Sequence, residues 1–182
     1  MKDIDGIEQI LSVLAPHWSD IEADFAKHNQ RFLELAAADH DLIGRVLRVH
    51  LVVESFVDSF LSSHFGIQDL PDLRLSFVQK AKLLPQSGSS ASFVRPGILQ
   101  LNAVRNKFGH RLNHTIEGHE ISAVHEALAV ARRGVTFAAA VDALEAFGPV
   151  ACAFLSVPPK HLQGLFVQAF KRVQSNDPFV AG

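Results

Sequence analysis

Hydrophobic residues recur along this chain at helical spacing, and no segment sustains the alternation that is typical of a strand. The pattern predicts helices at residues 3–14, 19–37, 39–65 and 74–84. After a loop at residues 85–92, it predicts helices at 96–113 and 120–146, with two more beyond a break at Gly148-Pro149. We therefore expect an all-α fold, with residues 1–38 as a helical extension and residues 39–182 as the main bundle.

Residues with strong terminal preferences define the expected helix ends. Ser19, with Glu22 three residues later, forms a capping box for the second helix. Asp39 is expected to cap the long third helix, and Gly66 to end it. Pro96 suits the first turn of the helix at residues 96–113.

Composition narrows the class of protein. With 182 residues, of which 48% are apolar, the chain can bury a sizeable core, and this excludes a disordered protein. The single cysteine, Cys152, excludes a disulfide framework within the chain. The first residues lack the pattern of a signal peptide, and charged residues interrupt the apolar stretch at 135–157, which reads as a buried helix. We therefore expect a cytoplasmic protein with no membrane association.

Charge is distributed unevenly along the chain. Residues 1–73 hold 13 acidic and 5 basic side chains, whereas residues 74–114 hold 7 basic side chains and no Asp or Glu. Such a basic segment can attract a polyanion. It can equally pack against the acidic first third of the same chain or of a partner chain, and the sequence favours neither interpretation.

The segment LNAVRNKFGHRLNH, residues 101–114, carries the most informative polar pattern. On a helix Asn106 and His110 share one face, and Arg105 lies roughly 140° from His110. An uncharged polar strip runs beside the apolar stripe and contains Asn102, Asn106, His110 and Asn113. Two interpretations are open: a functional site that faces a phosphodiester, or a polar network that only orients helices.

Other polar groups suggest weaker hypotheses. His50, Glu54 and Asp58 share one face of the long third helix, where they are expected to face solvent. In an alternative arrangement Glu54 reaches Arg105 across a helix pair and fixes its guanidinium.

Metal and nucleotide sites are not supported by the sequence. His110 and His114 have a spacing that can hold zinc, but no clear third ligand accompanies them. No GxxxxGK[ST] loop is present, and nothing around Cys152 resembles an activated nucleophile. We therefore expect neither a metal ion nor a cofactor.

A family resemblance rests on two stretches of this sequence. VRNKFGH, with four residues between Arg105 and His110, resembles the Arg-X4-6-His signature of the HEPN superfamily. RVLRVHLVVESFVDSFLSSHF resembles the long helix that precedes this signature, and with LRLSFVQKAKLL it is similar to the mannitol operon repressor branch. The resemblance covers roughly residues 40–145.

The resemblance implies an up-and-down helical bundle that dimerises, with two motifs meeting at a cleft. It implies either a metal-independent RNA endonuclease, such as the toxin of a toxin–antitoxin pair, or a non-catalytic regulatory module. The implied partners are a second copy, RNA, and an antitoxin or regulatory protein. The catalytic residues would be Arg105, Asn106 and His110, the RNA contacts Lys107, Arg111, His114 and Asn102, and the supporting residue Glu54.

Overall fold

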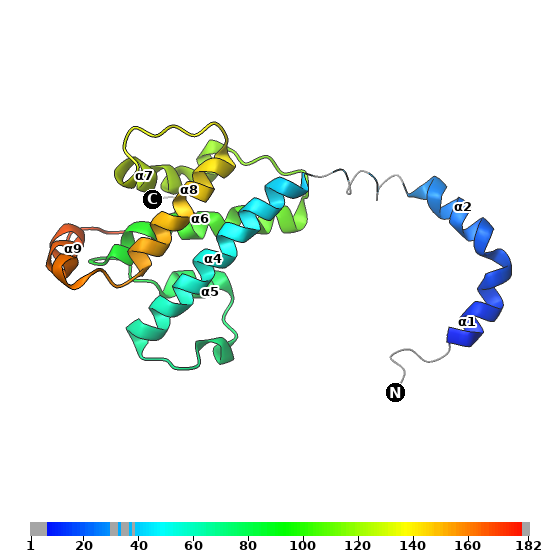
Figure 1. The fold of residues 1–182 in the computed structure, drawn as a ribbon, viewed down its shortest axis with the longest axis horizontal. Helices are drawn as coiled ribbons and strands as arrows, with labels where there is room; N and C mark the ends of the chain where they lie inside the picture. The colour runs from blue at the N-terminus through cyan, green and yellow to red at the C-terminus, as the bar shows by residue number, and fades with distance from the viewer. Residues whose placement is uncertain (1–6, 30–32, 34–36, 38, 180–182) are drawn as a thin grey trace. The chain divides into compact units, whose positions relative to one another are not determined.

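The structure is a computed structural model that describes residues 7–29, 33, 37 and 39–179 (Figure 1). Contacts within the chain divide it into two compact units, residues 1–38 and residues 39–182. Among the described residues the regular structure is helical and no strand forms, so the all-α prediction is confirmed for them. The predicted helical positions 3–6, 30–32 and 34–36 lie outside the described residues.

Between Ile7 and His28 the first unit forms short helices, and none of them has a buried side chain. They are α1 (Ile7–Leu14), the 3-10 turn η1 (Ala15–His17) and α2 (Trp18–His28). The predicted cap at Ser19 is wrong, because η1 leads directly into α2 and Ser19 already lies inside that helix. Asn29 ends α2 within the helix predicted at residues 19–37, but Leu33 is helical again, and its N–H donates to the Asn29 carbonyl at 3.1 Å.

The long helix α4 (His40–Phe65) has the ends that the sequence predicts. The Asp39 carboxylate accepts a hydrogen bond from the Leu42 backbone N–H at 2.9 Å, and Gly66 ends the helix with φ of 68°. One face of α4 enters the core through Val46, Val49, Val53, Val57 and Leu61. This stripe positions the other helices of the second unit.

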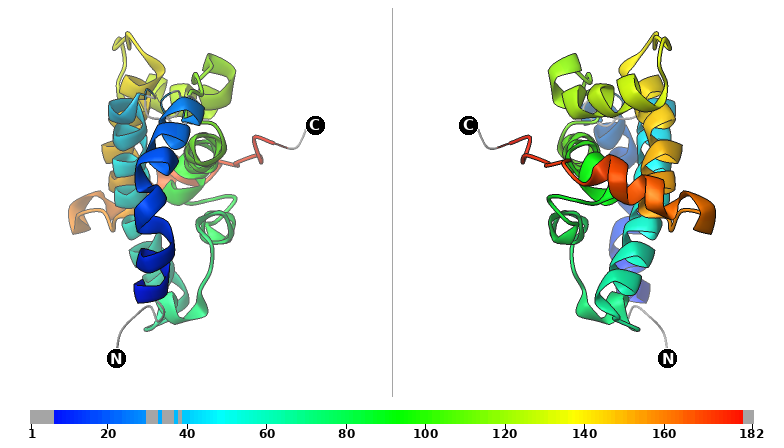
Figure 2. Two further views of the ribbon diagram at one scale, coloured as in Figure 1. Left: turned by 90° about the vertical axis from the view of Figure 1, so that its right-hand side faces the viewer. Right: turned by 90° about the vertical axis from the view of Figure 1, so that its left-hand side faces the viewer.

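The second unit is a bundle in which α6 (Ser90–His110) contacts most of the other helices. Helices α4 and α8 (Ala140–Leu155) lie side by side and both contact α6 (Figure 1). On one side α5 (Phe77–Leu83) packs against α4 and α6, and on the other α7 (Ser122–Ala131) packs against α6 and α8 (Figures 1 and 2). The remaining elements are η2 (Leu70–Leu73), η3 (Gly118–Ile121), η4 (Lys160–Leu162) and α9 (Gln163–Phe170).

Helix α6 begins earlier than its sequence predicts. Ser89 caps it by accepting a hydrogen bond from the Ala91 N–H at 3.2 Å, so Pro96 lies inside the helix rather than in its first turn. Proline removes one backbone donor, but the turns before it bury Ala91 and Val94 completely. Tertiary burial therefore outweighs the local cost of Pro96.

Two further predictions about helix ends are wrong in the C-terminal part. The expected helix at 120–146 is divided into η3, α7 and α8, with Gly134 at φ of 77° in the connection. Gly148-Pro149 does not break α8: Pro149 is exposed, and Gly148 faces α4. A Cβ on Gly148 would lie 3.2 Å from Cγ1 of Val49, so this glycine serves close helix packing instead of helix termination.

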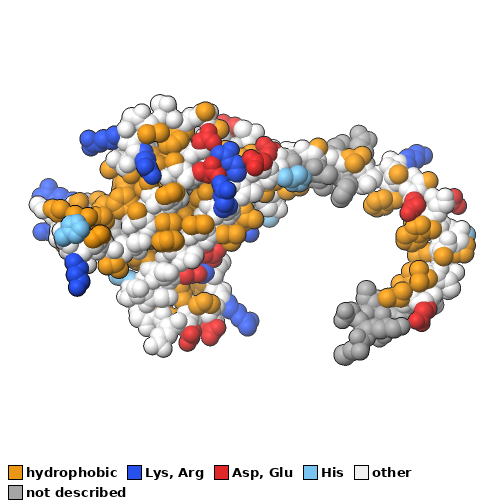
Figure 3. Space-filling view, in the orientation of Figure 1, with side chains coloured by type: hydrophobic (Ala, Val, Ile, Leu, Met, Phe, Trp, Pro, Cys, Tyr) orange, Lys and Arg blue, Asp and Glu red, His pale blue; other side chains and the backbone are white. Residues whose placement is uncertain are grey.

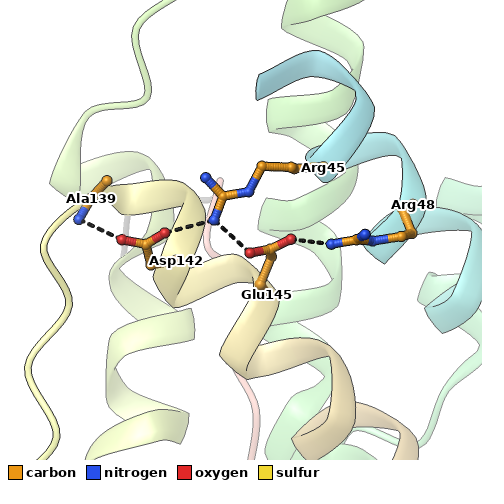
Figure 4. Close-up of polar contacts among 5 residues, drawn as sticks. All are labelled: Arg45, Arg48, Ala139, Asp142 and Glu145. Atoms are coloured by element: carbon orange, nitrogen blue, oxygen red, sulfur yellow. Dashed lines mark hydrogen bonds and ion pairs between the residues drawn. The ribbon is translucent and has the colours of Figure 1, made fainter. Parts of the chain in front are cut away.

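A polar cluster joins the first turns of α8 to α4 (Figure 4). One Nη of Arg45 donates to Asp142 at 2.6 Å and to Glu145 at 2.5 Å, and Arg48 also contacts Glu145. Hydrogen bonds from Arg45 hold the pKa of both carboxyls below their usual values. Asp142 also accepts from the Ala139 N–H at 3.1 Å, so one carboxylate caps α8 and fixes it to α4.

The apolar sequence of α8 reflects burial in the bundle. Nine of its residues are buried, including Cys152, and burial raises the pKa of that thiol. None of the described helices is by itself long and apolar enough to cross a membrane. Helix α8 reaches that length only together with the η4–α9 segment, across a bend of 88°.

Gly97 provides a test of the central packing. A Cβ at this position would lie 2.6 Å from Cζ of Phe147, so Gly97→Ala should lower the free energy of unfolding by about 1–3 kcal/mol. Gly109→Ala is the matched control on the same helix, since no atom lies within 4 Å of its Cβ position. It should raise the free energy of unfolding by about 0.5–1 kcal/mol. Urea denaturation measures both, and equal effects would contradict the close approach at Gly97.

Candidate functional site

The predicted motif lies where α6 leaves the core. Twelve residues of this helix are buried, and the last of them are Asn102, Val104 and Phe108. Between and beyond these buried residues, the polar side chains of the last turns are exposed, namely Arg105, Asn106, Lys107 and His110. Val104 and Phe108 hold one side of the helix in the bundle, so the opposite sides present the polar groups to solvent.

A hollow of about 370 Å³ lies beside the end of α6. Its lining contains Asn106, Lys107, His110, Arg111 and His114, together with Ala103. The sequence analysis predicts seven catalytic or RNA-contacting residues, and five of them share this concave surface. The predicted supporting residue, Glu54, is not counted among the seven. Amide, imidazole and cationic groups with no carboxylate in this lining suit an anionic ligand.

Arg105 joins this surface through Asn106. Its guanidinium Nη1 donates to the Asn106 carboxamide oxygen at 3.2 Å, and Arg105 itself is not among the residues that line the hollow. No hydrogen bond connects Arg105 with His110 in the described part of the chain. This agrees with the helix geometry, which separates the two side chains by roughly 140°.

Glu120, a residue that the sequence analysis did not single out, does not line the hollow but contacts two residues that do. Its side chain is only 7% exposed, and its carboxylate contacts the Lys107 ammonium and the His114 Nε2, the latter at 2.9 Å. It also accepts from the Glu117 N–H at 3.0 Å, which holds the η3 turn. Lys107 and His114 are thus held by a carboxylate within the chain.

The surroundings of His114 favour its neutral ring. Burial lowers its pKa, and the nearby charges of Lys107 and Arg111 lower it further. The contact with Glu120 favours a proton on Nε2, so the neutral ring donates that N–H to the carboxylate. The predicted i, i+4 pairing of His110 and His114 on one helix is wrong, because α6 ends at His110.

Asn102 faces the interior and not the hollow. It is 8% exposed and lies next to His50 of α4, which is 5% exposed and packs on the Phe77 ring at 4.2 Å between centroids. Burial lowers the pKa of His50, whereas the Asn102 amide and the Glu54 carboxylate raise it and the charge of Arg105 lowers it. Neither ring nitrogen of His50 has a partner at hydrogen-bonding geometry among the described residues.

The expectation that His50, Glu54 and Asp58 face solvent is wrong for this cluster. The Lys80 ammonium of α5 lies 3.0 Å from Glu54 and 2.9 Å from Asp58, and its side chain is largely buried. Burial alone would lower the pKa of Lys80, but the hydrogen bonds to Asp58 and Glu54 raise it overall. Glu54 therefore binds Lys80, and no hydrogen bond from Arg105 to Glu54 forms in the described residues.

The basic segment is partly neutralised within the fold. Lys80 pairs with carboxylates from the acidic first third of the chain, as one of the two interpretations proposed, and Lys107 pairs with Glu120. Arg95 is buried at 3% exposure. The exposed cations that remain from residues 74–114 are Arg74, Lys82, Arg105 and Arg111.

No group of three or more His, Cys, Asp or Glu side chains is placed to hold a metal ion in the part of the chain that the structure describes. One signal in the sequence points to a structural role for Glu120. It lies three residues after Glu117, the first carboxylate beyond the basic segment, at the spacing of a capping box.

Comparisons with protein-family models, with curated protein sequences and with solved structures found no match to this chain.

His50 predicts a dependence of stability on pH. Its pKa is lowered in the folded protein, so below about pH 6.5 the unfolded chain binds a proton that the folded chain does not. Acid should therefore reduce the free energy of unfolding. His50→Leu should flatten this dependence between about pH 7.5 and 5.5, by at most about 1.4 kcal/mol per pH unit. Urea denaturation at several pH values measures the slope.

His125→Gln is the control for this experiment, because His125 is exposed on α7. It should leave the wild-type slope unchanged. A His50→Leu slope equal to that of the wild type would contradict a lowered pKa at His50.

Proposed function

We propose that this protein is a HEPN-like, metal-independent RNA endonuclease in which Arg105, Asn106 and His110 form the catalytic group. The observation that carries the proposal is the hollow at the end of α6, which gathers Asn106, His110 and two cationic side chains. Its lining offers no carboxylate to repel a phosphodiester. The resemblance of VRNKFGH to the Arg-X4-6-His signature supplies the reaction class.

The available groups define the chemistry. The 2′-hydroxyl of the substrate attacks the adjacent phosphorus, the bond to the 5′-oxygen breaks, and a 2′,3′-cyclic phosphate remains. His110 serves as general base or acid, since imidazole titrates near neutral pH. Arg105 stabilises the negative charge on the phosphorus oxygens in the transition state. Asn106, which accepts a hydrogen bond from Arg105, orients the guanidinium.

A second copy of the chain completes this site in our proposal. One imidazole cannot readily serve both sides of the phosphorus, and Arg105 and His110 point from different sides of α6. A two-fold axis beside the exposed Asn106 and His110 brings the second pair of residues into the same cleft. The same surface is a target for an inhibiting partner such as an antitoxin.

The rival proposal is a non-catalytic regulatory module similar to the mannitol operon repressor branch. It is favoured by the contacts of Glu120, which hold Lys107 and His114 away from a ligand. In that case the polar end of α6 binds a partner protein and cleaves nothing.

The cleavage assay separates the two proposals. We expect slow cleavage of single-stranded RNA that EDTA does not inhibit and that leaves a 2′,3′-cyclic phosphate. His110→Ala and Arg105→Ala should each reduce the rate by about 100-fold or more, because each removes a group needed in the transition state. Labelled RNA incubated with purified wild type and variants measures the rates.

His125→Ala is the matched control for the loss of an imidazole, since its side chain is exposed on α7. It should cleave like the wild type, and circular dichroism should show that all variants keep their helices. Equal cleavage by wild type and His110→Ala would indicate a contaminating nuclease. No cleavage by the wild type would support the regulatory module.

Glu120 offers a second test of the same surface. Glu120→Gln removes the charge that holds Lys107, so RNA affinity at low salt should rise by about threefold to tenfold. Glu126→Gln makes the same change of charge at an exposed position on α7 and should have little effect. Fluorescence anisotropy with a labelled oligonucleotide measures both, and equal affinities would argue against RNA binding at the hollow.

A further inference from the structure

The first unit exposes an unusual amount of apolar surface. Neither α1 nor α2 has a single buried residue. Large apolar side chains are exposed on both helices, and they gather along the inner side of the curved segment (Figure 3). Isolated helices of this length are marginal in water, so such a surface implies a partner.

The spacing of these residues is that of a coiled coil. From Ile7 to His28 the chain has seven positions separated alternately by four and three residues, and six of the seven are apolar. These seam positions are Ile7, Leu11, Leu14, Trp18, Ile21, Phe25 and His28. A heptad pattern sustained over three repeats predicts helices that pair along the seam.

The break at η1 is compatible with this seam. Pro16 lies at the heptad position opposite the seam, about 180° from it on a helical wheel. The backbone donor that Pro16 lacks is therefore missing on the solvent side. All six seam residues from Ile7 to Phe25 remain exposed within the single chain.

We propose that the seam of the first unit pairs with the same seam of a second copy of this chain. A second copy always presents a seam of matching length and spacing. The flanking polar positions also fit: on heptad spacing His17 would lie opposite Glu22 of the partner subunit in a parallel pair, and opposite Asp24 of the partner subunit in an antiparallel pair with Leu14 facing Phe25.

An anionic membrane surface fits this unit less well than a second copy does. Residues 1–38 hold 7 acidic and 3 basic side chains, a net charge of −4. Interfacial helices that bind such membranes carry Lys and Arg on their polar faces. The polar positions of α2 instead carry Asp20, Glu22 and Asp24 against one lysine.

The position of the single tryptophan allows a direct test. Trp18 is a seam residue, is 51% exposed in the single chain and is the only tryptophan of the protein. Sedimentation velocity on the full chain over a range of concentrations gives the dissociation constant. Trp18 emission, recorded on the same samples, reports whether the seam is covered. We expect an assembly that dissociates on dilution, with a shift of the emission to longer wavelength.

The neighbouring residues Val13 and Leu14 supply the control and the test variant. Leu14→Glu places a carboxylate in the seam and should raise the dissociation constant at least tenfold, with Trp18 emission shifted to longer wavelength. Val13→Glu makes a similar change at a residue that is 59% exposed and lies about 120° from the seam, so it should leave both measurements unchanged. Thermal unfolding of each variant shows whether the bundle of residues 39–182 is intact.

Three results would overturn the proposal. The first is a monomeric wild type at the highest attainable concentration. The second is a dissociation constant that Leu14→Glu and Val13→Glu change equally. The third is Trp18 emission typical of a covered indole in a monomer, which would mean that another part of the same chain covers the seam. A monomeric wild type would also remove the second copy that the proposed function requires. The second and third results concern the seam alone and do not depend on RNA cleavage, so they separate the seam from the proposed function.

Discussion

Burial of α6 between α4, α5, α7 and α8 is the constraint on which the rest of the second unit depends. Gly97 lets the Phe147 ring of α8 approach the backbone of α6, and Gly148 lets α8 approach Val49 of α4 in the same way. Two close contacts of this kind fix the depth of α6 in the core. The point at which α6 emerges from the core, at Arg105 with only Phe108 still buried beyond it, is fixed by the same contacts.

Electrostatic balance inside the bundle determines which cations are available to a ligand. The carboxylates of α4 take up Lys80, and Glu120 takes up Lys107, so local sequence charge overstates the charge on the surface. The cations left near the end of α6 are Arg105 and Arg111. Binding of an anion there therefore depends on a few specific groups rather than on a broad basic face.

Local sequence signals correctly predicted the helix ends at which no long-range packing contact opposed them. Asp39 and Gly66 define α4 because a capping oxygen and a left-handed backbone act within one turn. The predicted helix start at Pro96 and the predicted break at Gly148-Pro149 are wrong, because helix packing outweighed the local preference of these residues. That packing involves residues 50 to 100 positions away in the sequence. Such contacts leave no mark in the neighbouring sequence.

The candidate site shows the same division. The candidate segment from Arg105 to His110 is predicted from its own residues, and the structure exposes Arg105, Asn106 and His110 at the end of α6. The roles of His50 and Glu54 depend on α5, whose Lys80 and Phe77 meet α4 only in the folded bundle. A periodic pattern on one helix cannot show which of its polar faces a second helix will cover.

Cys152 gives this arrangement a built-in reporter. The thiol is buried on α8, burial raises its pKa, and it is the only cysteine of the chain. A thiolate reacts with alkylating reagents and a buried thiol does not. Cys152 also lines a hollow between α4 and α8, together with Val49 and Val52 of α4. The rate at which this thiol is modified in the native protein therefore reports how far a reagent can enter that hollow, without any added label.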